Sequence, residues 1–259
     1  MSTIPPLSNF PSSRTAGRFA HVRGLFRSLL ATLLPGVSGC LSGCVAGNDA
    51  EGRLTVAAQA PEDGEPWPAN APIEIRFDRY LATVPVTSAG VRLVSAETDV
   101  PLGLLYDPVE RAVLVQPEIE LTPGVGYAFT LEPGAVRALD GTTLAEPLEI
   151  GFVAVAGGAR PPAPTVDFDA DVRPIFERRC SCHGPPPLTW PELTPEGLFD
   201  VPSRRNPALA LVAPGAPLRS QLVRKLLPAY PGVSGQSMPP EGPLSADALH
   251  TVLDWVRDL

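Results

Sequence analysis

Between Arg53 and Ala154, apolar and polar residues alternate in short runs that are separated by turn residues. Alternation sustained over about four to eight residues predicts a strand with one buried and one exposed face. Turn signals such as Pro123-Gly124 and Asp140-Gly141 fall between the runs. We therefore predict an antiparallel β-sandwich over residues 53–154. Its strands are expected at Leu54–Val56, Ile73–Phe77, Val91–Val94, Ala112–Val115, Tyr127–Leu131 and Leu148–Phe152.

The pattern becomes helical towards the end of the chain, where apolar residues recur three and four positions apart. The clearest helix follows Ser245, a typical N-cap residue, and gathers its apolar residues on one face. These apolar residues are Leu249, Val252, Leu253 and Val256. We therefore predict a small all-α domain over residues 167–259. Two further helices are expected: one around Val172, Ile175 and Phe176, capped by Asp169 or Asp171, and one over Pro217–Leu227.

A segment rich in glycine and proline separates the two predicted domains. Gly157-Gly158 favours a flexible hinge, and the prolines that follow favour a stiff, extended chain. We assign residues 155–166 to a linker, so the chain is expected to be a multidomain protein.

The composition excludes some classes of partner. The chain carries 28 acidic and 20 basic residues, which gives a formal net charge of −8. No acidic residue precedes position 44, so the remainder of the chain is more acidic still. Such a surface is a poor match for nucleic acid or for anionic membranes. The four cysteines form two close pairs, Cys40/Cys44 and Cys180/Cys182, and are not spread as in a disulfide framework.

Residues 1–44 have the organisation of an export signal. Several arginines precede the apolar run Leu29–Leu34, which is too short to span a membrane as a mature helix. Leu41-Ser42-Gly43-Cys44 resembles the lipobox of bacterial lipoproteins, in which the cysteine carries lipid, and Val37-Ser38-Gly39-Cys40 is a second match. The resemblance implies a lipid anchor at Cys44, or alternatively at Cys40, in the cell envelope, facing the periplasm or the cell exterior. An ordinary cleaved signal with incidental cysteines is the alternative.

Three segments of the predicted sandwich resemble bacterial Ig-like domains of the S-layer type. They are Pro72–Asp78, Leu121–Tyr127 with its Leu-x-Pro-x-x-x-Tyr pattern, and Ala138–Gly141 with a late Asp-Gly turn. The resemblance implies a spacer or docking module, and the region contains no histidine or cysteine. Trp67 and Tyr80 are expected to pack in the core or at an edge.

The candidate chemistry lies in Cys180-Ser181-Cys182-His183, directly after the first predicted helix. A cysteine followed at once by histidine, with a second cysteine upstream, is close to the C-x-x-C-H motif that attaches c-type haem. The second axial position of such an iron commonly takes a methionine from a distant loop. Met238, the sole methionine besides the initiator, lies in a proline-flanked loop and suits that position.

The second predicted domain resembles class I-like cytochrome c modules of multidomain bacterial lipoproteins. The matching segments, in order, are Val172–Phe176, Cys182–Gly184, Pro214-Gly215, Ser220–Val223, Met238–Pro240, Leu244-Ser245 and Val252–Val256. The resemblance implies one covalently bound haem c with thioethers from Cys180 and Cys182. It further implies His183 as the proximal iron ligand, Met238 as the distal ligand, and Trp255 on a last helix packed against the first.

The motif departs from the family pattern, because one residue instead of two separates the cysteines. Arg179 therefore occupies the usual position of the first cysteine. Three outcomes are compatible with this spacing: a single thioether from Cys182, a second one from Cys180 through a tightened turn, or loss of the haem. A zinc site made by both cysteines and His183 is a further alternative that lacks an evident fourth ligand.

Three other side chains deserve mention as weaker candidates. Arg204 and Arg205 are candidates for pairing with haem propionates, although paired arginines on a loop are usually solvated. His250 is an alternative to Met238 as a ligand, although a half-buried helix residue is the simpler interpretation.

The sequence-based hypothesis is an exported, lipid-anchored c-type cytochrome that carries single electrons between redox partner proteins. One haem without a second catalytic cluster favours an electron carrier over a stand-alone enzyme. The alternatives are a haem-free structural or binding lipoprotein, and a haem subunit of a larger oxidoreductase.

Overall fold

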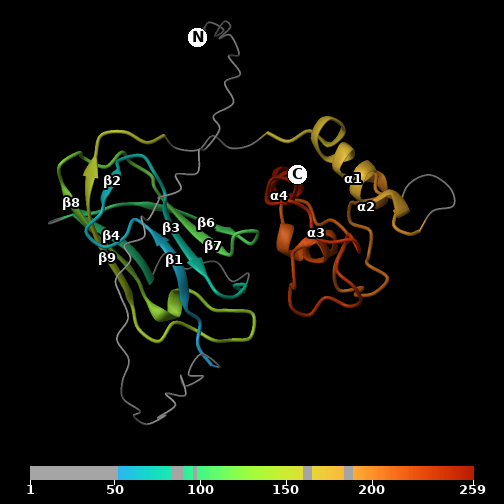
Figure 1. Ribbon diagram of the computed structural model, residues 1–259, viewed down its shortest axis with the longest axis horizontal. Helices are drawn as coiled ribbons and strands as arrows, with labels where there is room; N and C mark the ends of the chain where they lie inside the picture. The colour runs from blue at the N-terminus through green and yellow to red at the C-terminus, as the bar shows by residue number, and fades with distance from the viewer. Residues whose placement is uncertain (1–51, 83–89, 96–97, 160–164, 184–188) are drawn as a thin grey trace, which may run out of the picture. The chain divides into compact units, whose positions relative to one another are not determined.

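The computed structural model describes residues 52–82, 90–95, 98–159, 165–183 and 189–259 (Figure 1). These residues all belong to the second of two units into which the chain divides, Asn48–Leu259. The predicted signal segment, with Cys40 and Cys44, lies outside the described residues, as do residues 160–164 of the predicted linker. Within the described part of the chain, no helix has the length and apolar character needed to cross a membrane.

Residues 56–155 form two β-sheets. One sheet has the order β1-β3-β7-β6 and is antiparallel throughout. The other has the order β2-β9-β8-β4-β5, in which β2 pairs with β9 in parallel and the other pairs are antiparallel. The strands are β1 Val56–Ala60, β2 Pro66–Pro68, β3 Ile73–Phe77, β4 Val91–Ser95, β5 Thr98–Asp99, β6 Leu102–Asp107, β7 Ala112–Pro117, β8 Gly126–Leu131 and β9 Leu148–Val155.

Alternation places one face of each central strand in a shared core. Ile73, Ile75 and Phe77 of β3 are buried, and the residues between them are half-buried. Ile150 and Phe152 of β9 belong to the same hydrophobic cluster although they lie in the other sheet. Two sheets that share one core make an all-β domain, as the alternation predicts.

Five of the predicted strands coincide with β3, β4, β7, β8 and β9. The prediction at Leu54–Val56 was wrong in extent, because the strand begins at Val56, and Leu54 precedes it as a buried core residue. Three strands, β2, β5 and β6, are not predicted by the sequence pattern. Residues along β6 show no regular alternation of burial, and β2 contains two prolines, so neither has the signal of a half-buried strand.

In residues 168–183 and 189–258, the structure contains short helical elements joined by longer non-helical segments. Only the last one is a helix of ordinary length, and the α1 and α3 helices each have fewer than eight residues. The elements are η3 Phe168–Val172, α1 Arg173–Arg179, η4 Ser181–His183, α2 Pro195–Leu198, η5 Pro217–Arg219, α3 Gln221–Leu226 and α4 Ala246–Asp258.

The first predicted helix corresponds to η3 and α1, but its predicted cap was wrong. The Asp167 side chain accepts a hydrogen bond from the Ala170 amide (2.8 Å), and this residue caps the helix. Asp169 and Asp171 lie inside the first turn, where Asp171 Oδ2 accepts a hydrogen bond from the Asp167 amide (2.9 Å). The Asp167 side chain thus satisfies a backbone donor of the first turn, and the Asp171 side chain satisfies the backbone donor of Asp167, an arrangement similar to a capping box.

The predicted middle helix is not continuous. It is interrupted at Ser220, which separates the 3₁₀ turn η5 from α3. The buried Ser220 hydroxyl accepts a hydrogen bond from the Ala213 amide (2.8 Å) and lies 3.1 Å from the Ala216 carbonyl oxygen. A serine that bonds to neighbouring backbone groups competes with the helical pattern, which explains the break.

The last helix matches its prediction. The Ser245 hydroxyl accepts a hydrogen bond from the Ala248 amide (3.3 Å), and the four predicted apolar residues are buried. Trp255 is buried against three aromatic rings, with centroid distances of 5.1 Å to Phe168, 6.5 Å to Phe176 and 5.6 Å to Phe199. Since Phe176 belongs to α1, this aromatic cluster joins the first and last helices.

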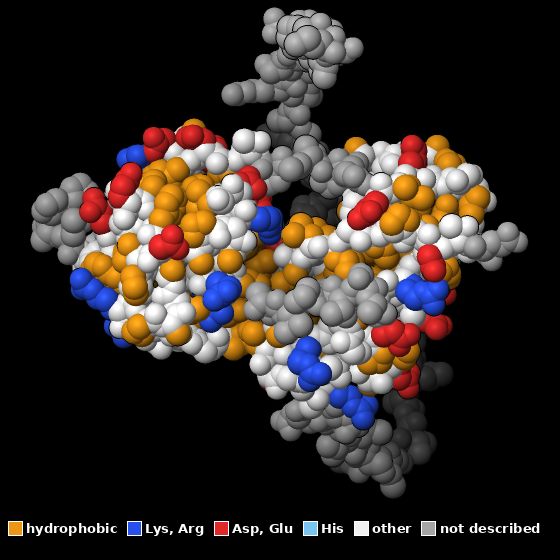
Figure 2. Space-filling model, turned by 180° about the vertical axis from the view of Figure 1, so that it is seen from behind, with side chains coloured by type: hydrophobic (Ala, Val, Ile, Leu, Met, Phe, Trp, Pro, Cys, Tyr) orange, Lys and Arg blue, Asp and Glu red, His pale blue; other side chains and the backbone are white. Residues whose placement is uncertain are grey.

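Tyr80 and Trp67 pack against other groups, as the sequence analysis expects. The Tyr80 hydroxyl donates a hydrogen bond to the Pro228 carbonyl (2.6 Å), and its ring lies 4.9 Å from that of Tyr230. Trp67 on β2 is partly buried against the core of the β domain. On the face drawn in Figure 2, hydrophobic side chains lie interspersed with acidic and basic ones.

Candidate functional site

A cavity of about 720 Å³ lies in the helical region and contains the predicted site residues. Cys180, Cys182, His183 and Met238 all line it, although more than fifty positions separate the methionine from the histidine in sequence. Its volume is within the range of about 300–1,000 Å³ that is typical of ligand and cofactor pockets. Much of the remaining wall is apolar, with contributions from Leu193, Leu198, Leu211, Leu222, Leu226 and Pro239.

The Cys-Ser-Cys-His segment is fixed by the end of α1. The helix stops at Arg179, and the Cys180 amide donates the last helical hydrogen bond to the Phe176 carbonyl (2.8 Å). The chain then tightens into the 3₁₀ turn η4, in which the His183 amide donates to the Cys180 carbonyl (2.9 Å). This turn brings both thiols and the imidazole to the same cavity wall.

The imidazole of His183 is held in one tautomer. Its Nδ1 atom lies 3.0 Å from the Thr189 carbonyl oxygen and 3.1 Å from the Pro191 carbonyl oxygen. Because carbonyl oxygens only accept hydrogen bonds, Nδ1 must carry the proton. In the neutral ring the lone pair then belongs to Nε2, which is the arrangement found in metal-binding histidines whose other nitrogen donates to a backbone carbonyl.

The two cysteines differ in environment. Both are free thiols in the described structure. Cys182 is exposed, whereas Cys180 is half-buried, and burial raises the pKa of the Cys180 thiol to about 11. The thiolate is the reactive form of cysteine, so Cys180 is the less reactive of the two near neutral pH.

Lys225 on α3 holds the loop that carries Met238. Its backbone carbonyl accepts a hydrogen bond from the Met238 amide (2.9 Å). Its ammonium group donates to the carbonyl oxygens of Ser234 (2.6 Å) and Gln236 (2.7 Å). Burial, and then the nearby charge of Arg205, lowers the pKa of Lys225. No motif or spacing in the sequence distinguishes Lys225, although it is the sole lysine of the chain.

Gln221 is a second cavity residue to which the sequence analysis gave no role. Gln221 is only 5% exposed and lines the cavity. Among the described residues, its Nε2 atom has no hydrogen-bond partner. No spacing or motif in the sequence signals this feature, because it depends on what surrounds the amide in space.

The cavity wall carries more positive than negative charge. Its cationic residues are Arg179, Arg204, Arg205 and Lys225, and its acidic residue is Glu241. Arg204 lies over the Trp190 ring, with 4.4 Å between the guanidinium carbon and the ring centroid. Arg179 donates to the Gly242 carbonyl (3.0 Å). The wall therefore suits a ligand that is apolar over most of its surface and carries negative charge.

Two alternative ligand arrangements are not formed. Nowhere in the described ranges do three histidine, cysteine, aspartate or glutamate side chains come together as a metal-binding group. The zinc site considered at Cys180, Cys182 and His183 is therefore not formed. His250, considered as an iron ligand, does not line the cavity. Its Nε2 atom instead lies 2.8 Å from Oδ2 of Asp107, and the side chain is half-buried, as the simpler interpretation expects.

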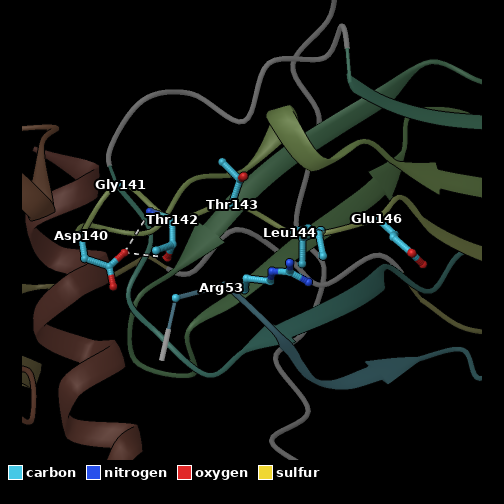
Figure 3. Close-up of a pocket in the computed structure, with 9 residues that line it drawn as sticks. Arg53, Asp140, Gly141, Thr142, Thr143, Leu144 and Glu146 are labelled. Carbon is cyan, nitrogen blue, oxygen red and sulfur yellow. Dashed lines mark hydrogen bonds between the residues drawn. The ribbon is translucent and has the colours of Figure 1, made fainter. Parts of the chain in front are cut away.

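A second hollow lies on the β domain and is shown in Figure 3. It is bordered by Arg53 and by the turn that contains Asp140. Asp140 Oδ1 accepts hydrogen bonds from the amide (3.0 Å) and hydroxyl (2.6 Å) of Thr142, and Oδ2 pairs with Arg79 (2.6 Å). These contacts lower the pKa of Asp140 to about 2. Both oxygens of the Asp140 carboxylate therefore serve to stabilise the turn.

Comparisons with known proteins add little to this site. No family model and no curated protein matches the chain. Among solved structures, the N-terminal part of the bacterial S-layer protein SbsC is 12% identical, with a TM-score of 0.33 over 41% of this chain and 24% of that one. The MG0-NIE-MG1 part of Escherichia coli α2-macroglobulin is 14% identical, with a TM-score of 0.33 over 40% and 33% of the two chains. The copper resistance protein PcoC of Escherichia coli is 16% identical, with a TM-score of 0.31 over 39% and 98%.

These similarities are weak, and they involve an S-layer protein and other β folds. At such scores they carry no argument about activity. This chain spans less than two thirds of the SbsC and α2-macroglobulin structures that it matches. The candidate site must therefore be judged from its own residues.

Proposed function

We propose that this protein is an exported electron carrier that binds one c-type haem in the cavity of its helical region. The observation that carries the proposal is the meeting of Cys180-Ser181-Cys182-His183 and Met238 in one apolar cavity. These are the thiol, imidazole and thioether groups that c-type haem requires, and they come from two segments that are distant in sequence.

The residues of the cavity fit a haem in several independent respects. The wall combines leucine side chains with basic ones, which matches an apolar macrocycle that carries carboxylates. Nε2 of His183 has its lone pair available, because Nδ1 is engaged by two carbonyl oxygens. Met238 supplies a soft sulfur ligand on a loop that Lys225 holds in position. When bound, the haem iron would supply one-electron chemistry between Fe(II) and Fe(III).

We assign the covalent attachment to Cys182 in the first place. Its thiol is exposed and adjoins the histidine, whereas the Cys180 thiol is half-buried with a raised pKa. In thioether formation the sulfur bonds to one vinyl carbon and the thiol hydrogen passes to the other, so no oxidant is needed. A second thioether from Cys180 is an alternative, which fragment ions of the haem peptide in tandem mass spectrometry would distinguish.

The sequence supports a location and a class of partner for this carrier. The signal-like segment 1–44, with Cys44 or Cys40 as the lipidation site, supports anchoring in the cell envelope. Outside the cytoplasm, the β domain would act as a spacer of Ig-like type, and the helical region would be a cytochrome c-like domain. Electron transfer by a single haem requires redox partner proteins, and the acidic chain favours basic surfaces on them.

The direct test is the absorption spectrum of the full chain matured in a cell that attaches c-type haem. We expect a Soret band, one haem per chain by pyridine haemochrome, and a weak red band from methionine ligation in the oxidised protein. Met238→Ala should retain the haem and lose the red band. Absence of a Soret band in the wild-type protein would reject the proposal and favour a haem-free structural or binding lipoprotein.

A further inference from the structure

Gln221 is a feature of the cavity that the proposed function leaves unexplained. The residue is 5% exposed and lines the cavity, and its Nε2 atom has no hydrogen-bond partner in the described part of the chain. Buried amide donors are nearly always paired, because an unpaired donor bears the full cost of losing its hydration. The amide therefore calls for an acceptor atom that a ligand of the cavity would supply.

The acceptor is expected to be anionic, because positive charge lies close to Gln221. Lys225 follows Gln221 by four positions, so the two side chains lie on the same side of α3. Lys225 and Arg205 both approach Gly235. A Cβ atom built on this glycine would lie 3.4 Å from Lys225 Nζ and 3.5 Å from the Arg205 guanidinium carbon. The two cationic groups are therefore near neighbours. The lowered pKa of Lys225, due to burial and then to Arg205, is a consequence of this arrangement.

The N–H donors of Lys225 and Arg205 are not equally available to a ligand. Lys225 directs its ammonium group to two backbone carbonyl oxygens. Arg205 lines the cavity and makes no hydrogen bond or ion pair with any described residue. Among the described residues, the buried amide of Gln221 and the guanidinium of Arg205 are therefore cavity donors without an acceptor.

We propose that Gln221 Nε2 and the Arg205 guanidinium form a carboxylate-binding subsite, which receives a propionate of the bound haem. The inference deepens the proposed function and rests on it. A carboxylate has two oxygens and a negative charge, so it pairs with the amide through one oxygen and with the guanidinium through the other. The group that neutralises the cations is then the same group that satisfies the amide.

The test compares two probes on the full chain purified without haem: hemin, and hemin dimethyl ester, which has no free carboxylate. Hydrogen bonds to a charged group change affinity by about tenfold or more, so wild type should bind hemin at least about tenfold more tightly than the diester. Gln221→Leu should weaken hemin binding by about tenfold and leave diester binding unchanged. Gln116→Leu is the matched control, because that amide bonds to the Asn70 and Pro117 carbonyl oxygens in the β domain. It should leave both affinities unchanged.

The outcomes separate this inference from the function on which it rests. Equal loss of hemin and diester binding in Gln221→Leu, or no loss of either, would overturn the subsite while leaving haem binding intact. Failure of the wild-type chain to bind either probe would overturn the proposed function and the subsite together. If Gln221→Leu does not fold, Gln221→Glu keeps the side-chain shape and replaces the donor by a negative charge. It should weaken hemin binding more than Gln221→Leu would, and an unchanged preference for hemin would overturn the subsite.

Discussion

The β domain and the helical region of this protein are built on opposite principles. No buried polar or charged residue is found in the described part of the β domain, whereas the helical region buries Ser203, Ser220 and Gln221. Two sheets pair the strands of the β domain through backbone hydrogen bonds. The helical region relies on short turns and on contacts such as those of Lys225. The β domain has a core of its own, although Tyr80 packs in the core of the helical region, and the helical region encloses the cavity that contains the candidate site.

The strongest challenge to this comparison is a matched pair of core substitutions. Phe129→Ala in the β domain and Trp255→Ala in the helical region should each lower the free energy of unfolding by about 3–5 kcal/mol, because each removes a buried aromatic side chain. The effects should be seen by different probes in denaturant titrations of the haem-loaded protein. Trp255→Ala should shift the transition seen by haem absorption, and Phe129→Ala the transition seen by the β-sheet circular dichroism. If both variants shift both transitions equally, the two regions unfold as one unit and the comparison is wrong.

Thiol reactivity sharpens the comparison, because the described cysteines both lie in the helical region. In the haem-free chain at pH 8, iodoacetamide should modify Cys182 more than about tenfold faster than Cys180, since a thiol with a pKa near 11 is almost fully protonated there. Raising the pH towards 11 should narrow the difference, because the Cys180 thiolate then forms. Peptide mass spectrometry after timed quenching measures both rates. Equal rates at pH 8 would contradict the assigned environments.

The same raised pKa predicts a smaller effect on stability. The folded protein holds the Cys180 proton more tightly than the unfolded chain, whose thiol has its ordinary pKa near 9.0. The protonated Cys180 thiol therefore makes its full contribution to the free energy of unfolding below pH 9. That contribution is lost as the pH rises from about 9 to about 11. The loss should be absent in Cys180→Ala, and its persistence in that variant would assign it to another group.

The loop contacts of Lys225 provide a finer test. Lys225→Met should lower the free energy of unfolding by about 1–2 kcal/mol, because two backbone carbonyl oxygens lose a charged donor. The red absorption that reports methionine ligation should weaken, while the haem remains attached. Arg219→Met, on an exposed side chain of the neighbouring turn, is the control and should change neither property. An unchanged red band in Lys225→Met would show that Met238 is positioned by other contacts.

The sequence predicted those features that have a local pattern. Alternation located β3 and β9, and apolar spacing located α4, because each pattern arises from the period of its own element. The strand β6 lacks alternating burial, and the helix break at Ser220 depends on a bond to Ala213 across a loop. Neither the strand β6 nor the helix break at Ser220 therefore produces a recognisable pattern in the residues next to it.

The candidate site divides in the same way. Cys182 and His183 are adjacent in a recognisable motif, and Met238 is distinctive because methionine is so rare in this chain. The positions of Gln221 and Lys225 became informative only when their partners, or the absence of a partner, were known in space. Side chains that support a ligand through such contacts are not distinguished by spacing.

The most direct test of the account is tandem mass spectrometry of the peptide that contains Cys180-Ser181-Cys182-His183, taken from the matured full-length protein. The account predicts the mass of one haem on this peptide, with fragment ions that place it on Cys182. Attachment through both cysteines would revise the role of Cys180. A peptide without haem, from cells that attach haem to other c-type cytochromes, would contradict the central claim.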